Sequence, residues 1–214
     1  KQALDILQKM IVRTHSSDLL RQWEQYNQTY EYLLKYTIEG VDDPQREMVY
    51  RNLRGDVLEL ADNTREQLLE ATGMQTYRMR PDMRTEEEAI KTVDELTFSH
   101  ELEQLIQDNL SPHTQQDETS TQDMALQRIF RWIWLSNHFH EAEINLINSL
   151  RTSSTIPWQD KSLIVSAITL SMLRIFDKQK ATLLFSFYSD REHQVWQRAL
   201  VGLVFTLYKY DDRL

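Results

Sequence analysis

The chain of 214 residues is 41% hydrophobic and 10% aromatic, which is enough for a hydrophobic core and argues against a wholly disordered chain. It contains no cysteine, so disulfides, thiolate nucleophiles and cysteine-ligated zinc or iron–sulfur sites are excluded. The net charge of −9 comes from the first part of the chain: residues 1–120 contain 13 Lys and Arg against 24 Asp and Glu, whereas residues 121–214 contain 11 against 9. Nucleic acid is not an expected partner, because binding to phosphates needs clustered cations.

The scarcity of turn-forming residues favours long helices. Only four glycines and four prolines occur, and sheet-rich folds need many more of them in their turns. We therefore expect an all-α fold of about eight or nine helices and no sheet, with antiparallel hairpins stacked as an α-solenoid. Residues 163–176 are too short to span a membrane and are interrupted by Arg174. The absence of a visible signal or transmembrane segment favours the cytoplasm. Lys1 in place of an initiator Met is expected of a trimmed sequence or of a processed fragment.

Hydrophobic residues at helical spacing predict three helices in the first part of the chain. They cover residues 2–14, 17–39 and 44–71. Ser16 or Ser17 is the expected N-cap of the second helix, and Gly40 suits the left-handed position after it. Asp43 is the expected N-cap of the third helix, with Pro44 as its first residue. So short a turn should pair the second and third helices as an antiparallel hairpin.

Gly55 lies inside the third helix and should weaken it by about 1 kcal/mol relative to Ala. A close crossing with another helix would explain this glycine. Residues 74–84 form a predicted loop, after which Thr85 and Glu88 have the spacing of a capping box. A fourth helix should therefore start there and reach about residue 110.

The polar stretch 111–122 is the predicted linker or loop between two halves. We expect an acidic N-terminal helical array over residues 1–110 and a second set of helices over residues 123–214. The helices expected in the second half cover residues 123–135, 139–150, 162–176, 178–188 and 194–210.

Two runs in the second half, 162–176 and 194–210, are hydrophobic on nearly every side. A helix that is apolar all round is normally buried all round. The sequence ends at Leu214, just after the second run. Since the last unit of a helical stack needs a polar outer face, we expect either further repeats of a longer polypeptide or a homodimer through this helix.

Residues 166–172 can be aligned with residues 199–205 at an offset of 33, which pairs small residues at two positions. Stacked α-hairpins have repeats of about this length. The segment 198–203, Arg-Ala-Leu-Val-Gly-Leu, resembles the first-helix core of the HEAT/armadillo class of α-solenoids. The resemblance covers residues 124–212 and implies a scaffold with a binding surface and no chemistry.

Two groups of side chains are candidates for binding a partner. Tyr32 and Tyr36 lie on a different side of the second helix from its main hydrophobic stripe. Arg78, Arg80 and Arg84 share one predicted loop, and arginine forks suit carboxylates or phosphates. The alternative for these arginines is pairing with the glutamates that follow the loop.

His138, His140, Glu141 and Glu143 are the cluster that most resembles a metal or acid–base site. On a helix, however, His138 shares a face with Glu141 and His140 shares another with Glu143, so the four cannot converge on one ion. We expect a polar hinge there and no bound metal. Four tryptophans at helical spacing are predicted to be core residues. They are Trp132, Trp134, Trp158 and Trp196.

Enzymatic motifs are missing from the sequence. Its four glycines are too dispersed for a phosphate-binding loop, and no Gly-x-Ser-x-Gly elbow occurs. The sequence therefore predicts a non-enzymatic protein–protein interaction or scaffold module without a cofactor. The alternative is a ligand-binding helical bundle or small enzyme with a pocket between the two halves, near residues 138–143 and 78–84.

Overall fold

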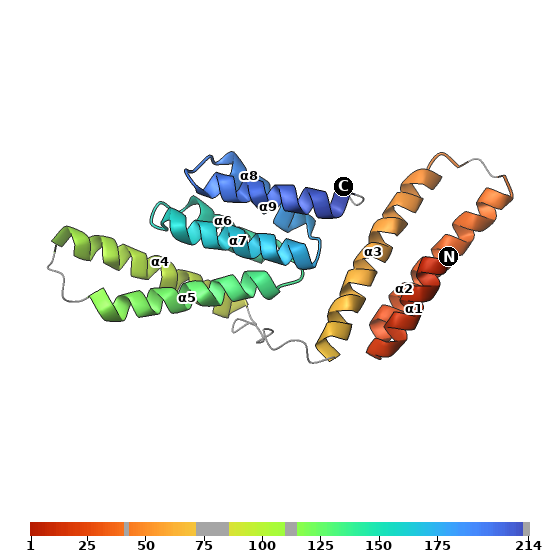
Figure 1. Cartoon of the computed structure of the whole chain (residues 1–214), viewed down its shortest axis with the longest axis horizontal. Helices are drawn as coiled ribbons and strands as arrows, with labels where there is room; N and C mark the ends of the chain where they lie inside the picture. The colour runs from red at the N-terminus through yellow and green to blue at the C-terminus, as the bar shows by residue number, and fades with distance from the viewer. Residues whose placement is uncertain (41–42, 72–85, 110–114, 212–214) are drawn as a thin grey trace. The chain divides into compact units, whose positions relative to one another are not determined.

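The computed structural model describes residues 1–40, 43–71, 86–109 and 115–211. Within these ranges the chain forms nine helices and no strand, so the all-α prediction is confirmed (Figure 1). The helices are α1 (Gln2–Thr14), α2 (Ser17–Ile38), α3 (Arg46–Ala71), α4 (Glu86–Asn109), α5 (Gln115–Leu135), α6 (Glu141–Thr152), α7 (Trp158–Arg174), α8 (Lys178–Ser189) and α9 (Val195–Tyr210).

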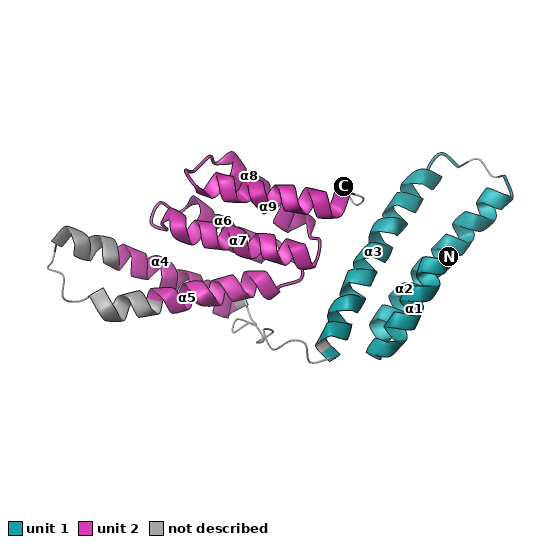
Figure 2. Cartoon of the chain, in the orientation of Figure 1, with its two compact units in different colours: residues 1–77, 213 teal, residues 78–212, 214 magenta. Residues whose placement is uncertain are grey.

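The chain forms two compact units that divide between residues 77 and 78 (Figure 2). Unit 1 contains α1–α3 and unit 2 contains α4–α9. The sequence placed the boundary at 111–122 instead, but residues 115–122 belong to α5, which packs against α4; residues 111–114 lie outside the described residues. Residues 115–122 contain three Gln and one Glu, which are good helix formers, so the polarity of this stretch did not mark a linker.

Unit 1 is a set of three helices around a small core. The buried core residues are Leu4, Leu7, Ile11, Leu19, Trp23 and Leu60. The indole Nε1 of Trp23 donates a hydrogen bond to the carbonyl oxygen of Leu4 at 2.9 Å, which ties α2 to α1. The helices α2 and α3 pack against each other as the predicted hairpin.

The helix ends in unit 1 follow their local sequence. The Ser16 hydroxyl accepts from the backbone N–H of Leu19 at 3.4 Å, and Gly40 has a φ of 71°, as predicted. The Asp43 carboxylate accepts from the backbone N–H of Gln45 at 2.9 Å, although α3 itself begins two residues after Pro44. The capping box predicted at Thr85 falls on a residue outside the described ones.

Unit 2 is built from two layers of helices. In one layer α5, α7 and α9 lie side by side, with α7 packed against both neighbours (Figure 1). In the other layer α6 contacts α4 and α8. Its core draws on all six helices, including Leu96, Ile129, Ile147, Ile168, Leu184 and Ala199. His100 of α4 also bonds the Asp160 carboxylate of α7, with 2.7 Å between Nε2 and Oδ2.

The two apolar runs are covered to different degrees. Ile164, Ile168 and Met172 of α7 are fully buried, as predicted, although Leu163 and Leu170 are exposed. In α9 the prediction of burial on every side is wrong. Its buried residues occupy an arc of about 100° at 100° per residue, namely Val195, Ala199, Gly202, Leu203, Thr206 and Tyr210. The rest of the helix is open.

A close approach joins α7 and α9 at Thr169 and Gly202. A Cβ atom on Gly202 would lie 2.3 Å from the Oγ1 of Thr169. Thr169 and Gly202, which match at an offset of 33, therefore face each other across this contact. In stacked repeats, equivalent side chains point in the same direction. Two residues that face each other are therefore not equivalent positions of a repeat, and the alignment at an offset of 33 does not identify one.

Candidate functional site

An apolar groove with a volume of about 750 Å³ lies between α7 and α9. Its lining combines hydrophobic residues with a cation and several uncharged polar groups. These residues include Trp158, Ser166, Leu170, His193, Arg198, Val201 and Phe205. The close contact at Gly202 brings the two helices together beneath it. The α7–α9 groove is thus a shallow surface built on two rigid helices.

The electrostatics of the α7–α9 groove differ from those of the chain as a whole. No Asp or Glu is found among the described residues that line it, although the chain has a net charge of −9. Arg198 Nη1 donates to the Ser166 hydroxyl at 2.9 Å, which holds the guanidinium beside the groove. Helix α9 contains Arg198 and Lys209 and no acidic residue. This surface is locally cationic.

A second groove of about 480 Å³ lies between α5 and α7, with Leu126, Phe130 and Leu163 among its lining residues. Leu163 lines this groove and Leu170 lines the α7–α9 groove. These leucines are seven residues apart, so they lie on the same side of α7. The two grooves therefore flank one face of the layer, which we call the outer face.

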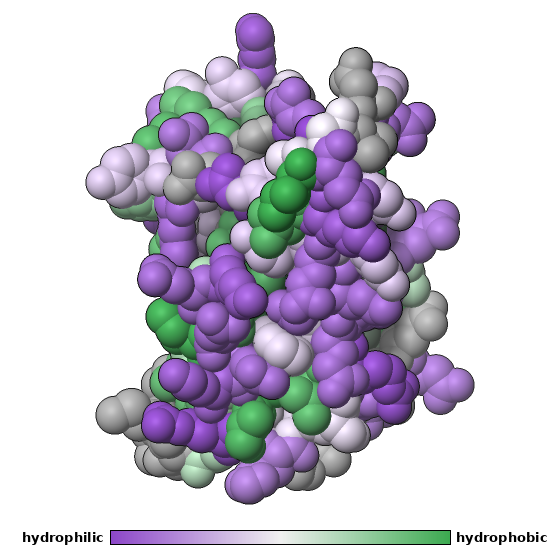
Figure 3. Space-filling view, turned by 90° about the vertical axis from the view of Figure 1, so that its right-hand side faces the viewer, coloured by the Kyte–Doolittle hydropathy of each residue, from purple (hydrophilic) through white to green (hydrophobic). Residues whose placement is uncertain are grey.

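Helix α9 extends the outer face with an uncovered hydrophobic side. Its large exposed residues are Leu200, Val201, Val204, Phe205, Leu207 and Tyr208. At 100° per residue they form one continuous arc, and Val201 and Val204 are 52% and 54% exposed. Figure 3 views the molecule from the right-hand side of Figure 1, where α1 and α2 lie. It shows a mostly hydrophilic surface with hydrophobic residues in small patches, as is usual for amphipathic helices. From Leu200 to Tyr208 the exposed arc of α9 is hydrophobic, and the exposed Gln197 interrupts it one turn earlier.

Lys180, at the start of α8, is fully buried in a polar cluster. Its Nζ donates to the carbonyl oxygens of Ser136 and Asn137 at 2.6 and 3.0 Å, and to the Ser171 hydroxyl at 2.8 Å. The same Nζ lies 4.5 Å from the ring centroid of Phe139. The cluster joins the turn after α5 to α7 and α8.

Asp177 completes this cluster from the N-terminal end of α8. One carboxylate oxygen accepts from the backbone N–H of Gln179, and the other accepts from that of Phe139, both at 2.7 Å. Burial lowers the pKa of Lys180 to about 7, and the Asp177 carboxylate opposes this shift. A lysine with so low a pKa can serve as a nucleophile. Here the amine is enclosed and bonded to three oxygens, so its role is structural.

The residues that the sequence proposed for partner binding are not brought together in one described site. Tyr32 and Tyr36 are 52% and 49% exposed on one side of α2, and the Tyr32 hydroxyl accepts from the Gln28 side chain. Arg78, Arg80 and Arg84 lie outside the described residues.

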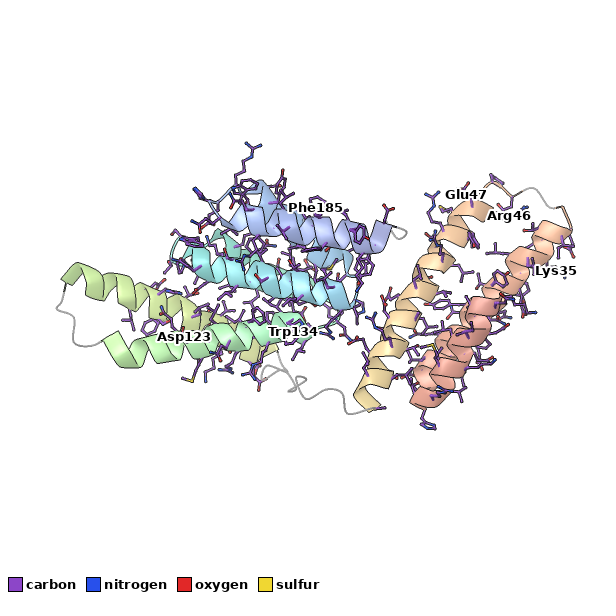
Figure 4. The ribbon with its side chains drawn as sticks, in the orientation of Figure 1. Lys35, Arg46, Glu47, Asp123, Trp134 and Phe185 are labelled. Carbon is purple, nitrogen blue, oxygen red and sulfur yellow. The ribbon has the colours of Figure 1, made fainter. Side chains whose placement is uncertain are left out.

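Unit 1 has a groove of its own, about 520 Å³ in volume, where α2 ends and α3 begins. Tyr30, Leu33 and Tyr50 supply much of its lining, and Tyr32 and Tyr36 do not line it. Arg46 and Glu47 also line the groove, and Figure 4 labels both at this end of the unit, near Lys35. Its mixed charges indicate no single kind of ligand.

The His138–Glu143 cluster acts as a helix start. The backbone N–H of His140, the N-cap of α6, donates to the Glu143 carboxylate at 2.8 Å. Among the described residues there is no group of three or more His, Cys, Asp or Glu that could hold a metal ion. The cluster therefore contributes to the fold as a polar turn.

The tryptophans are divided between core and surface. Trp132 is buried, and Trp134, near the end of α5, is partly buried against the core (Figure 4). Trp196 contacts Tyr188 edge-on. Trp158 is 40% exposed and lines the α7–α9 groove, so the prediction of a core residue is wrong for Trp158.

The sequence signal for this surface was the hydrophobicity of α9, which the sequence analysis interpreted as burial. The run over α9 is apolar on more sides than two layers of helices can cover, and only one arc finds neighbours. The position of Leu170, Val201 and Phe205 around one groove depends on the α7–α9 contact, which the sequence pattern did not specify.

No protein-family model, curated protein or solved structure matches this chain. Within the described residues, no helix combines the length and hydrophobicity needed to cross a membrane.

Proposed function

We propose that the protein is a non-enzymatic protein–protein interaction module, with unit 2 as a HEAT-like helical scaffold. One observation carries the proposal: the hydrophobic arc of α9 that no described residue of unit 2 covers. Burying this apolar surface against a partner would contribute roughly 25 cal/mol per Å² to the free energy of binding. Large contiguous apolar patches on a protein surface mark interaction sites.

The packing of α7 supports a stacked arrangement. At an offset of 31, five buried residues of α9 correspond to buried residues of α7 or its C-cap residue Ile175. The pairs are Ile164 with Val195, Ile168 with Ala199, Ser171 with Gly202, Met172 with Leu203 and Ile175 with Thr206. By the same offset Thr169, which meets α9, corresponds to Leu200, which is exposed. The open side of α9 thus corresponds to the side of α7 that a further helix covers.

The exposed arc of α9 can be buried in three ways: by further helices of a longer polypeptide, by a second copy of this chain, or by a different protein. Each would make unit 2 a scaffold that works by contact. The enclosed amine of Lys180 offers no reactive group to a substrate, which supports a role without catalysis.

The test uses the whole chain and the double variant Val201→Glu/Val204→Glu. A matched control is Phe98→Glu, since Phe98 is exposed on α4, away from α9. We expect light scattering or affinity capture from the source cells to show an association that the double variant loses and the control keeps. An association that the double variant leaves intact contradicts the proposal.

A parallel screen addresses the alternative of a ligand-binding bundle or enzyme. The chain is heated with transition metals, phosphorylated compounds and acidic small molecules in turn. Bound metal, or a rise of several degrees in the melting temperature with one compound, would favour that alternative. Unchanged melting temperatures are expected if the chain works through protein contacts.

A further inference from the structure

The outer face of unit 2 has the features of a groove that receives a helix. Its two grooves run between rigid helices and share the exposed side of α7 marked by Leu163 and Leu170. The backbone around them is helical apart from the turn at His193 and Gln194, so it has no strand edge that could pair with an extended strand. A helix satisfies its own backbone hydrogen bonds and needs only an apolar stripe to dock.

The charge on this face specifies the partner further. Arg198 lies beside Val201 and Phe205, and its guanidinium is held by the Ser166 hydroxyl. A planar guanidinium pairs well with a carboxylate. His193 lies on the same groove, and no acidic residue is found among its described lining. An acidic side chain on the edge of an apolar stripe would therefore meet a cation.

We infer that the α7–α9 groove binds an amphipathic helix of a partner protein, with its apolar stripe on Leu170, Val201 and Phe205 and a Glu or Asp on its flank beside Arg198. This inference rests on the proposed function and names the class of partner. The apolar stripe provides affinity, and the flanking carboxylate provides selectivity, because complementary charge discriminates among partners of similar hydrophobicity.

The test uses two synthetic peptides of about 18 residues, or five helical turns. Both carry the same stripe of leucine and alanine; one has glutamates on its flanks and the other has lysines. Fluorescence anisotropy with the full chain should give a dissociation constant at least tenfold lower for the glutamate peptide. Raising the salt from about 0.05 to 0.5 M should narrow this difference, because salt screens exposed charges.

Two substitutions separate the contributions of charge and hydrophobic contact. Arg198→Glu should reverse the preference between the peptides, while Arg191→Glu, at an exposed position outside the groove lining, should leave it unchanged. Val201→Glu should weaken binding of the glutamate peptide at least tenfold, and Phe98→Glu should not. Thermal melts followed by circular dichroism check that each variant is folded.

Equal affinity for the two peptides, or binding that Val201→Glu leaves unchanged, would overturn the inference. If neither peptide binds but the double variant of the previous section still loses an association, the helical partner is wrong and the interaction module stands. If light scattering reveals a dimer that Val201→Glu disrupts, the groove is occupied by a second copy and the inference of a foreign helix is again wrong. If neither peptide binds and the double variant loses no association, both proposals are contradicted.

Discussion

Lys180 illustrates how a single residue joins three helices of unit 2. Its ammonium donates to two backbone carbonyls in the turn after α5 and to Ser171 of α7, while its own backbone N–H is capped by Asp177. Buried charges are tolerated only with such a set of partners. A lysine within a predicted helix gives no sign of this role, since its acceptors are distant in sequence.

Lys180→Met should lower the free energy of unfolding by about 2–3 kcal/mol at pH 7, because it leaves buried carbonyl oxygens without their donor. Lys178→Met, at an exposed position on the same helix, should change it by less than about 0.5 kcal/mol. Urea denaturation of both variants measures the difference. Equal stability of the two variants would show that the Lys180 hydrogen bonds contribute nothing.

The low pKa of Lys180 predicts a pH dependence of its own. The pKa is about 7 in the folded chain and 10.5 without the fold, so between these values the unfolded chain binds more protons. Raising the pH from 7 to 9 should therefore increase the stability of the wild type relative to Lys180→Met, by at most about 1.4 kcal/mol per pH unit. Below about pH 6 the difference should be smallest and constant. A relative stability that falls as the pH rises would contradict this assignment.

Gly202 fixes the distance between α7 and α9. Gly202→Ala should destabilise unit 2 by about 1–3 kcal/mol through overpacking, because the new Cβ would meet Thr169 Oγ1, which is itself bonded to the Val165 carbonyl. Gly55→Ala is the matched control: nothing lies within 4 Å of its added Cβ, so it should stabilise α3 by about 0.5–1 kcal/mol. Thermal melts measure both. A stabilising Gly202→Ala would contradict the close contact.

At the scale of single elements, the sequence predicted helices well and their surroundings less well. Periodicity and caps such as Ser16 and Gly40 identified nearly every described helix, because these signals are local. Gly55 suggested a close crossing, but the crossing is at Gly202. The two glycines look alike in sequence, and only the neighbouring helix distinguishes them.

Helix α9 is the element where sequence reasoning failed most informatively. Its apolar residues were interpreted as buried on all sides, yet Val204 and Phe205 are about half exposed. A hydrophobic side chain favours apolar neighbours, but its hydrophobicity does not indicate whether those neighbours belong to the same chain or to another protein. The same residues therefore became the candidate binding site. Of the residues chosen from the sequence, Tyr32 and Tyr36 do not line the groove of unit 1, and the three arginines lie outside the described residues.

At the scale of the whole molecule, the two units have separate cores. One core lies within α1–α3, and the other includes Val93 and Leu96 of α4 together with Ile129 of α5. A boundary at 111–122 would separate α4 from the core it helps to form. Composition and charge changed at that point of the sequence, but packing did not.

Fragments 1–77 and 78–214 should therefore each fold. Their circular dichroism spectra should add up to that of the whole chain, and each should melt cooperatively. A fragment 123–214 should be much less stable, because it lacks α4. If fragment 78–214 is unfolded while 123–214 melts cooperatively, the division at 77 and 78 is wrong.

The central claim is that the α7–α9 face is a docking surface for a helix, and methyl NMR tests it most directly. With the glutamate-flanked peptide added to the whole chain, we predict shifts of the methyl signals of Leu170, Val201 and Val204, with Ile11 and Leu60 of unit 1 unchanged. Shifts confined to unit 1, or an unchanged spectrum at saturating peptide, would contradict the claim.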